Sequence, residues 1–443
     1  MRIILKNFHI VDENLDIEGS VTADDGIITV VKQGKSGCVK RIFPIEDDSA
    51  ALVINGRNMI TEKGELPLLM PAFVDLHAHF RESVLPEKEP PLPSELLESA
   101  SLAAAAGGYG TVVCMANTKP VTDTIEKAAA VKRRSDVLGL IDLYPVLALS
   151  KNMEGKELSE ITNLQNEGGV RGGGLYVPLM LSEDGKDLAD DALFLAAMNE
   201  ARRIEVPVSC HCDLDGENNA VNRAIELGKK AGCHIHIAHV STKEAVEIIR
   251  RAKAENSRQG GTFRLTCEVM PHNISLTEED AQKLGKESFG RVNPPLRTEE
   301  DRLALINALK DGTIDAIATD HAPHSKADKE KGSPGFSGLE TAFAVCHSTL
   351  VRSGELGLSF LSLLMSANPA GIIGLGGPKG RGRIHTGSRA DFVIIDPNAS
   401  WIADPAEFKT RGKNSPFAGR MLYGKILMTL HEGRVVFENH SKK

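Results

Sequence analysis

Two histidines and an arginine alternate within residues 74–81, whose sequence is VDLHAHFR and which follow the apolar run 66–73. Residues two apart on a β-strand point to the same side, so His77, His79 and Arg81 are predicted to share one face. Imidazole nitrogens bind zinc-like metal ions, whereas a guanidinium group binds carboxylates and phosphates. The pattern therefore indicates metal chemistry on an acidic small molecule.

Two histidines do not complete the coordination sphere of a zinc ion, and a His-x-His pair also arises by chance. The remaining ligands must therefore come from other parts of the chain. Cys210 and Cys212 flank His211, but on a strand both thiols would point away from that imidazole. This geometry argues against a thiolate site at these residues.

The bulk composition is that of an ordinary globular protein, with 41% hydrophobic and 25% charged residues. The net charge of −8 gives no electrostatic reason to bind nucleic acid or an anionic membrane surface. We find no basic-then-apolar leader, and no apolar run approaches the roughly 18 residues of a membrane span. Seven cysteines, an odd number, do not suggest a disulfide framework. We therefore expect a cytoplasmic protein.

Strand-like segments without intervening helices occupy both ends of the chain. They cover residues 2–5, 26–32 and 51–54 near the start, and 390–395, 424–430 and 434–437 near the end. We expect them to form a small β-sandwich domain built from both termini, with residues 1–65 and 376–443 as its two parts.

The middle of the chain alternates helices with strands. Helical stretches at 94–106, 191–203, 219–230 and 299–310 are each followed by a strand, at 111–115, 206–210, 234–238 and 313–319, and 175–181 is a further strand-like run. Repeated helix-then-strand units favour a parallel α/β barrel, so residues 66–375 are predicted to form a (β/α)8 TIM-type barrel. A chain of 443 residues accommodates such a barrel and one small domain.

In such a barrel the active site lies at the carboxyl ends of the strands. Five predicted strands end at or just before a histidine or an aspartate, and these residues are His77, His79, Asp184, His211, His239 and Asp320. Each has an ordinary alternative, because a lone histidine is commonly a structural hydrogen-bonding residue and an aspartate after a strand often caps a turn. Together they offer four imidazoles and two carboxylates, enough for one or two divalent ions.

Three further histidines near these strands receive no ligand role. His234 and His236 have a parity opposite to that of His239 on the same strand, so they are predicted to pack inside or outside the barrel. His321 follows Asp320 directly and has no predicted function.

Several motifs resemble those of the class I dihydroorotases of the amidohydrolase superfamily, and the resemblance covers nearly the whole chain. The most specific are residues 75–82 (DLHAHFRE), 103–108 (AAAAGG), 115–118 (MANT), 182–185 (SEDG), 239–242 (HVST), 292–297 (VNPPLR) and 318–324 (ATDHAPH). The resemblance implies a zinc-dependent enzyme of pyrimidine biosynthesis that reversibly cyclises N-carbamoyl-L-aspartate to L-dihydroorotate. It also implies a homodimer.

The resemblance distributes the six candidate ligands over one or two zinc ions. One ion would be held by His77, His79 and Asp320, and Asp184 would bridge to a second ion whose other ligands are His211 and His239. Water activated by the metal would attack the ring carbonyl. Asp320 would be the catalytic acid–base, taking a proton from that water and passing it to the leaving amide nitrogen.

Substrate recognition is assigned to a second group of residues by the same resemblance. Arg81, Asn117 and His324 would bind the substrate carboxylate. Asn293 would contact the pyrimidine ring, and the backbone near Gly335 is a further ring contact.

The bridging residue separates this family from its relatives. Dihydropyrimidinases, and allantoinases as a rule, bridge their metals with a carbamylated lysine, but here no lysine lies between Lys156 and Lys186. Asp184 is the available bridge, and Arg81 suits a carboxylate that neutral dihydropyrimidines lack. An allantoinase or a hydantoinase-like enzyme is the alternative activity. An inactive homologue that acts as a scaffold for a partner enzyme is a third interpretation, which the retained ligands disfavour.

Some positions depart from the family pattern. Ser83-Val84 and a Pro- and Glu-rich stretch to Pro93 stand where Pro-Gly is usual, and Ala116 replaces a proline. These changes affect the loops around the substrate and leave every candidate ligand in place. The Lys- and Gly-rich segment 325–337 suits either a mobile lid or an exposed solvated loop.

Overall fold

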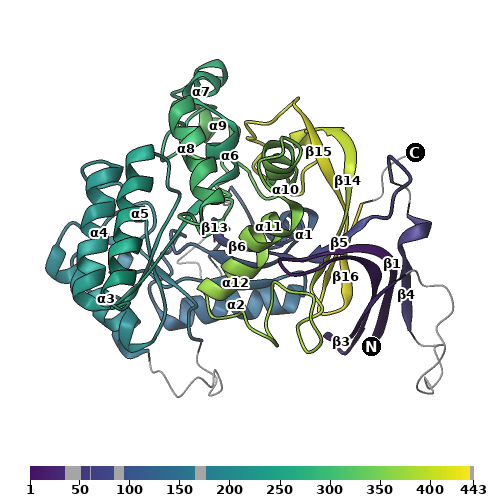
Figure 1. Cartoon of the computed structure of the whole chain (residues 1–443). Helices are drawn as coiled ribbons and strands as arrows, with labels where there is room; N and C mark the ends of the chain where they lie inside the picture. The colour runs from purple at the N-terminus through teal and green to yellow at the C-terminus, as the bar shows by residue number, and fades with distance from the viewer. Residues whose placement is uncertain (35–50, 60, 84–93, 165–175, 440–443) are drawn as a thin grey trace.

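The computed structural model describes residues 1–34, 51–59, 61–83, 94–164 and 176–439, and its strands form three sheets (Figure 1). Both ends of the chain enter one eight-stranded sheet, here called the terminal sheet, whose order is β16-β15-β14-β5-β1-β2-β3 with β4 paired to β1. Its strands are β1 (Arg2–Val11), β2 (Asp16–Asp24), β3 (Ile27–Gln33), β4 (Leu52–Asn55), β5 (Leu68–Pro71), β14 (Phe392–Ile402), β15 (Met421–His431) and β16 (Arg434–Glu438).

The terminal sheet forms because apolar residues alternate along its strands. In β1 and β2 buried residues alternate with more exposed ones, and the buried side chains of Leu5, Ile10 and Val21 join those of Phe392 and Ile394 in one cluster. Strands from the two chain ends thus share a sheet. The strand order does not by itself establish the two layers of the predicted sandwich. β2 was not predicted, because its sequence DIEGSVTAD contains a glycine and three charged residues.

The middle of the chain supplies two sheets in which every strand pair is parallel. The orders are β13-β12-β11-β10-β9 and β6-β7-β8. The strands are β6 (Phe73–Ala78), β7 (Tyr109–Cys114), β8 (Asp142–Pro145), β9 (Leu181–Ser182), β10 (Val208–Cys210), β11 (His234–Ile237), β12 (Arg264–Val269) and β13 (Ala316–Ile317). The prediction of an α/β fold with parallel strands is confirmed.

Single bridges join the edges of the two parallel sheets. Leu147, just after β8, pairs in parallel with Leu181 of β9, and Ala78 of β6 pairs in parallel with His321, which follows β13. The backbone N–H of His79 donates to the carbonyl of His321 at 2.8 Å. The strand predicted at 175–181 is much shorter in the structure, where β9 starts at Leu181, because Pro178 has no N–H to donate to a ladder. Residue 175 lies outside the described residues.

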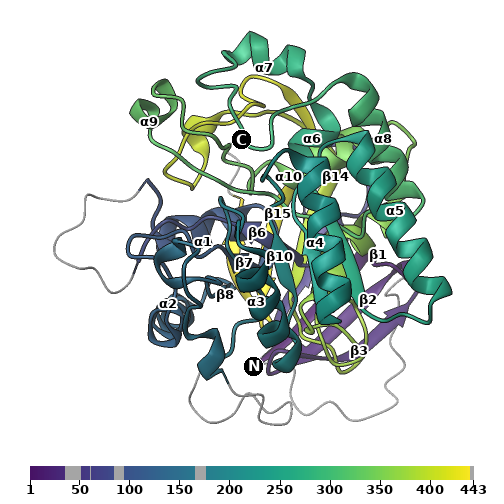
Figure 2. The same cartoon turned by 90° about the vertical axis from the view of Figure 1, so that its left-hand side faces the viewer.

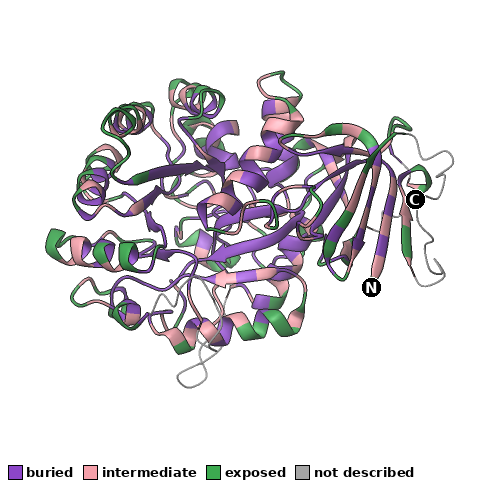
Figure 3. Ribbon diagram, turned by 60° about the horizontal axis from the view of Figure 1, so that its bottom comes forward, coloured by how far each residue is buried: buried purple, intermediate pink, exposed green. Residues whose placement is uncertain are grey.

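Helices connect the parallel strands and cover them on the outside (Figure 2). The long ones are α1 (Leu97–Ala106), α2 (Ile125–Leu138), α3 (Asp191–Arg203), α4 (Glu217–Ala231), α5 (Lys243–Arg258) and α8 (Glu299–Lys310). α1, α3, α4 and α8 confirm the four predicted helical stretches, whereas α2 and α5 were not predicted. Figure 3 shows the parallel strands mostly buried and the exposed residues on the outer helix faces. α5, for example, buries Ala245, Val246, Ile249 and Ala252, which share one face at helical spacing.

Shorter elements complete the described part of the chain. They are α6 (Pro271–Ser275), α7 (Glu278–Leu284), α9 (Lys326–Glu330), α10 (Ala342–Cys346), α11 (Leu358–Ser362) and α12 (Asn368–Ile372), π-helical segments at His347–Val351 and Leu363–Ala367, and single 3-10 turns at Gly56–Asn58, Lys151–Met153, Glu160–Asn163 and Pro405–Glu407. In the described ranges, none of these helices combines the length and apolarity needed to cross a bilayer.

Candidate active site and metal centre

The six candidate ligands lie where parallel strands end. His77 is on β6 and His79 follows it, while Asp184, His211, His239 and Asp320 come within three residues of the ends of β9, β10, β11 and β13. All six are buried. Because the carboxyl ends of parallel strands meet at one edge, these side chains converge.

Short contacts connect the side chains of this cluster. His77 Nε2 lies 3.0 Å from Asp184 Oδ1 and 3.7 Å from Asp320 Oδ1, and His79 Nε2 lies 3.0 Å from Asp320 Oδ1. The rings of His77 and His239 have centroids 5.3 Å apart, and those of His211 and His239 are 4.3 Å apart. His77, His79 and Asp320 each offer one ligand atom within 4.8 Å of the others. The structure therefore brings all six residues together.

The backbone is strained at three of these strand exits. Arg81, His239 and Asp320 have φ values of 56°, 32° and 44°, in a region that side-chain-bearing residues rarely adopt. Such conformations cost free energy and cluster at functional sites, where the surrounding structure enforces them. The sequence carries no signal for this strain, because none of the three is glycine.

The donor set fits a divalent metal ion. His211 Nδ1 and His239 Nε2 are buried and have no hydrogen-bond partner among the described residues. Burial, reinforced by the neighbouring His211 and His77, holds the pKa of His239 well below its usual value, so its imidazole is neutral. A neutral imidazole with an unshared lone pair is the form that binds metals.

The two carboxylates of the cluster are ionised. Burial alone would raise the pKa of Asp184, but the charges of His79 and His77 and a hydrogen bond from His77 hold it well below the usual range. The pKa of Asp320 is lowered in the same way, against burial, by a hydrogen bond from His79 and by the neighbouring imidazoles. Ionised carboxylates are the form in which aspartate binds zinc-like ions.

Arg81, Asn117 and His324 form a second group beside the cluster. Asn117 Nδ2 donates to Asp184 Oδ2 at 2.8 Å, and Asn117 Oδ1 lies 2.9 Å from His79 Nδ1 and 3.4 Å from Arg81 Nη1. His324 Nε2 lies 3.5 Å from Arg81 Nη2. Within the described ranges no carboxylate pairs with Arg81, and its buried Nε has no acceptor. A guanidinium with free donors next to a metal centre can bind an anionic substrate.

Asn293 and Gly335 lie on two loops near this group. Asn293 Nδ2 donates to Asp213 Oδ2 at 3.2 Å, two residues beyond His211. Gly335 has a φ of 137°, and a Cβ there would come within 2.6 Å of the carbonyl oxygen of Ala322. This close approach requires glycine. The substrate contacts of Asn293 and Gly335 stay predictions.

Two buried carboxylates that support the cluster were missed by the sequence analysis. Glu268 of β12 lies 2.9 Å from His77 Nδ1, and 3.1 Å from the imidazole of His236. Asp75 accepts hydrogen bonds from the N–H and hydroxyl of Thr319, at 3.0 and 2.5 Å, and burial raises its pKa to about 7. A carboxylate inside a short strand-forming segment was the available signal for both.

The three histidines without a predicted ligand role contact nearby polar groups. Thr266 Oγ1 lies 2.8 Å from His234 Nε2 and 2.9 Å from His236 Nδ1, so both imidazoles contact the neighbouring strand β12. His321 Nδ1 accepts the N–H of Gly338 at 3.2 Å, and its Nε2 lies 3.7 Å from a carboxylate oxygen of the buried Glu95. His321 thus ties the loop after β13 to its surroundings.

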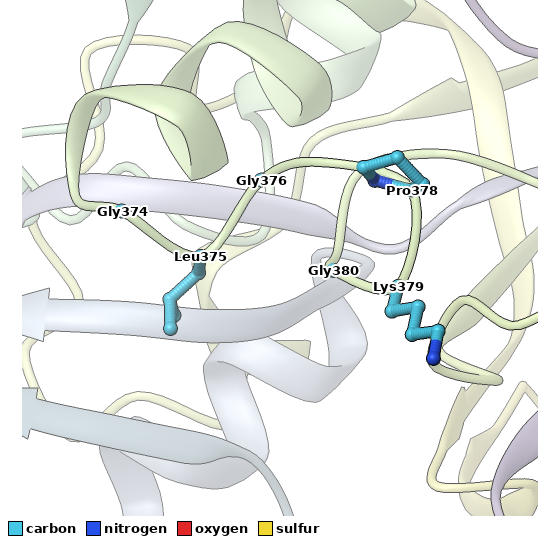
Figure 4. A pocket seen from close by; sticks show the side chains of 6 residues that line it. All are labelled: Gly374, Leu375, Gly376, Pro378, Lys379 and Gly380. Atoms are coloured by element: carbon cyan, nitrogen blue, oxygen red, sulfur yellow. The ribbon is translucent and has the colours of Figure 1, made fainter. Parts of the chain in front are cut away.

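A hollow of about 590 Å³ elsewhere on the surface carries none of this chemistry (Figure 4). It is lined by residues 374–376 and 378–380, among which are three glycines and one charged residue, Lys379. With no carboxylate or imidazole in its lining, it offers neither metal ligands nor an acid–base pair.

Comparison with known proteins agrees with the geometry of the cluster. Residues 68–436 match the model of the amidohydrolase family. The chain belongs to this family. Among curated relatives, a dihydroorotase of Clostridium botulinum (strain Eklund 17B / Type B) is 36% identical, over 99% of this chain and 100% of the relative. A dihydroorotase of Thermoanaerobacter sp. (strain X514) is 35% identical, over 100% of this chain and 99% of the relative. These relatives place the chain among the dihydroorotases of the family.

Solved structures show the same fold. An L-hydantoinase (dihydropyrimidinase) from Arthrobacter aurescens superposes with a TM-score of 0.80 at 24% identity, over 98% of this chain and 96% of that one. At this identity the likeness establishes the fold. Amidohydrolases are metal-dependent, and the buried cluster of His77, His79 and Asp320 provides a site for a metal.

Proposed function

We propose that this protein is a dihydroorotase that interconverts N-carbamoyl-L-aspartate and L-dihydroorotate. The observation that carries the proposal is the placement of Arg81, Asn117 and His324 beside the six-ligand cluster, in a chain whose relatives are dihydroorotases along their whole length. A cationic group with free donors at that place matches the carboxylate of both compounds.

The bridging residue supports the same activity. No lysine lies between Lys156 and Lys186, and Asp184 contacts His77 at 3.0 Å and His79 at 3.7 Å. A carbamylated-lysine bridge, expected of dihydropyrimidinases, therefore has no candidate here. Although hydantoinases share this fold, a neutral cyclic amide is a poorer substrate candidate, because it would leave Arg81 without an anionic partner.

The metal in this proposal is zinc, as one or two ions. His77, His79 and Asp320 would hold one ion, and Asp184, His211 and His239 would complete a second site. The imidazole-rich donor set suits zinc. When bound, such an ion activates water and polarises the carbonyl of a cyclic amide.

The protein's own residues then bind substrate and move a proton. Arg81 would bind the substrate carboxylate through two parallel N–H bonds, with Asn117 and His324 orienting it. Asp320 Oδ would accept the proton of the attacking water and deliver it to the amide nitrogen as the C–N bond breaks. In the direction of cyclisation the same carboxylate would take the proton from that nitrogen. Asn293 and the backbone at Gly335 would contact the ring.

We also propose a division of the chain into a barrel and a sandwich domain. The two single bridges between the parallel sheets support a closed (β/α)8 barrel of β6 to β13 over residues 66–375, with residues 1–65 and 376–443 as the two parts of a β-sandwich. β5, at Leu68–Pro71, pairs with β1 and β14, so the first limit of the barrel would fall between β5 and β6. We also propose a homodimer located in the cytoplasm, following the family.

One assay tests the activity directly. Purified protein of measured metal content would be given dihydroorotate, N-carbamoyl-aspartate, allantoin, hydantoin and dihydrouracil in parallel. We expect turnover of the first two, rising with zinc content. Faster turnover of a neutral ring than of dihydroorotate would overturn the proposed function.

A further inference from the structure

Lys329 is a buried cation held by backbone alone. Its side chain is fully buried, and Nζ donates to three carbonyl oxygens, of Arg291 at 2.8 Å, Ser333 at 2.7 Å and Gly335 at 3.0 Å. The ammonium also lies 5.5 Å from the centre of the Phe336 ring. Within the described ranges no carboxylate pairs with it. An ammonium group has three donors, so this one is fully used.

The three carbonyls belong to two loops at the proposed substrate site. Arg291 precedes Asn293 by two residues, and Ser333 and Gly335 enclose Pro334, whose carbonyl accepts a hydrogen bond from His324 Nε2 at 2.8 Å. His324 in turn lies 3.5 Å from Arg81. A continuous series of contacts therefore runs from Lys329 through the 333–335 turn to the proposed carboxylate-binding arginine.

Two of the three carbonyls do not depend on Lys329 for a hydrogen-bond donor. The Arg291 carbonyl also accepts the N–H of Gly335, and the Gly335 carbonyl also accepts Nδ2 of Asn414. Without Lys329, only the half-buried Ser333 carbonyl would lose its donor among the contacts described here. Burial, with the charge of Arg291, lowers the pKa of Lys329 to about 8, so the fold disfavours the charged form. Burial thus disfavours the charge, yet the ammonium binds three carbonyls, which points to a role in positioning the backbone around it.

We propose that Lys329 is a positioning residue that fixes the 333–335 turn as one wall of the substrate pocket, and that segment 325–337 is therefore a rigid wall rather than a lid. The proposal rests on the proposed function for its substrate. Lys329 acts through Pro334 and His324 on the orientation of Arg81, and through Gly335 on the ring contact.

The test compares Lys329→Met with Lys326→Met in the holoenzyme. Lys326 lies on the same short helix α9, but its side chain is 82% exposed, so it is a matched control. For Lys329→Met we expect KM for dihydroorotate to rise about tenfold while kcat changes less than about threefold, because a displaced wall weakens binding and orientation. Hydrogen exchange at 333–336 should accelerate, and the thermal midpoint should stay within about 2 °C. Lys326→Met should match the parent in every measurement.

A second variant guards against a folding defect. Lys329→Gln keeps two donors for the carbonyls and should give an intermediate KM. An unchanged KM in both variants would overturn the proposal, and so would a large drop in thermal midpoint with KM unchanged, which indicates a structural role. If the parent protein has no dihydroorotase activity, the proposed function fails separately. In that case the rate of hydrogen exchange at 333–336 still tests whether Lys329 holds the turn in place. Equal exchange rates in Lys329→Met and the parent would overturn the proposal of a rigid wall.

Discussion

The parallel sheets and the terminal sheet both contain fully buried strand segments, but the buried residues differ in their chemistry. All six residues of β6 are buried, including Asp75 and His77, and β12 buries Glu268. In the terminal sheet the buried start of β14 has four apolar residues, Phe392 to Ile395, and one carboxylate, Asp396, which accepts the backbone N–H groups of Asn398 and Ala399. Burial of apolar surface stabilises the fold, whereas burial of charge costs free energy unless each group is paired.

The pairing of those charges shows what the parallel sheets are built for. Asp75 holds the loop of Thr319, just before Asp320, and Glu268 holds the ring of His77. Asp187 similarly accepts three backbone N–H groups at 212–214, directly after His211. These carboxylates fix ligand loops, so the free energy spent on burying them maintains a site. The terminal sheet holds none of the six candidate ligands. Mutations in the parallel sheets should therefore change activity, whereas mutations in the terminal sheet should change stability.

The largest expected effect is on turnover, in Asp320→Asn. The substitution keeps the shape but removes the proposed proton acceptor, so kcat should fall about 10²- to 10⁴-fold while dihydroorotate still binds. Asp396→Asn is the matched control, because Asp396 is a buried aspartate of β14 that caps backbone N–H groups in the terminal sheet. Its turnover should equal that of the parent. Near-normal turnover of Asp320→Asn in an initial-rate assay would remove the acid–base assignment.

Phe8→Ala, in the terminal sheet, should lower the free energy of unfolding without changing activity. Phe8 is fully buried, and truncation of such a side chain costs about 3–5 kcal/mol. Denaturant unfolding should show this loss, while kcat and KM of the folded protein stay at parent values. A changed KM would mean that the two regions are coupled, contrary to the comparison.

Arg81→Met should act on substrate binding. Loss of a charge-assisted hydrogen-bonded pair costs about 1.5–3 kcal/mol, so KM for dihydroorotate should rise about tenfold to a hundredfold. The control is Arg352→Met, whose guanidinium lies 3.7 Å from the ring centre of Tyr423 at the terminal sheet and which should leave KM unchanged. If both variants bound dihydroorotate as the parent does, the carboxylate-binding role of Arg81 would be wrong.

The smallest effect is expected for Glu268→Gln, which changes the support of a ligand and not the ligand itself. Outer partners of metal-binding histidines typically contribute about 10- to 100-fold in metal affinity. Chelator competition on the zinc-loaded protein should show that weakening. Glu340→Gln is the control, because Glu340 accepts backbone N–H groups of Lys409 and Thr410 and, among the described residues, forms no hydrogen bond or ion pair with the six candidate ligands. Equal zinc affinity in both variants would make Glu268 purely structural.

Much of the site could be read from the chain because a local rule applied. Residues just after buried strands of a parallel α/β unit converge at one edge, and this rule predicts from sequence that His77, His79, Asp184, His211, His239 and Asp320 lie together. Helices α3 and α8 were predictable for a similar reason, since capping residues such as Asp190 and Thr298 mark where they begin.

The residues that hold the site in place depend on tertiary contacts. Glu268 meets His77 across 191 residues, and Asp75 meets Thr319 across 244, so neither pair has a local pattern. Lys329 binds backbone carbonyls, which every residue possesses and which leave no trace in the sequence. The sequence alone therefore determined which groups could do the chemistry. Only the folded chain decided what holds them in place, because that depends on contacts between segments far apart along it.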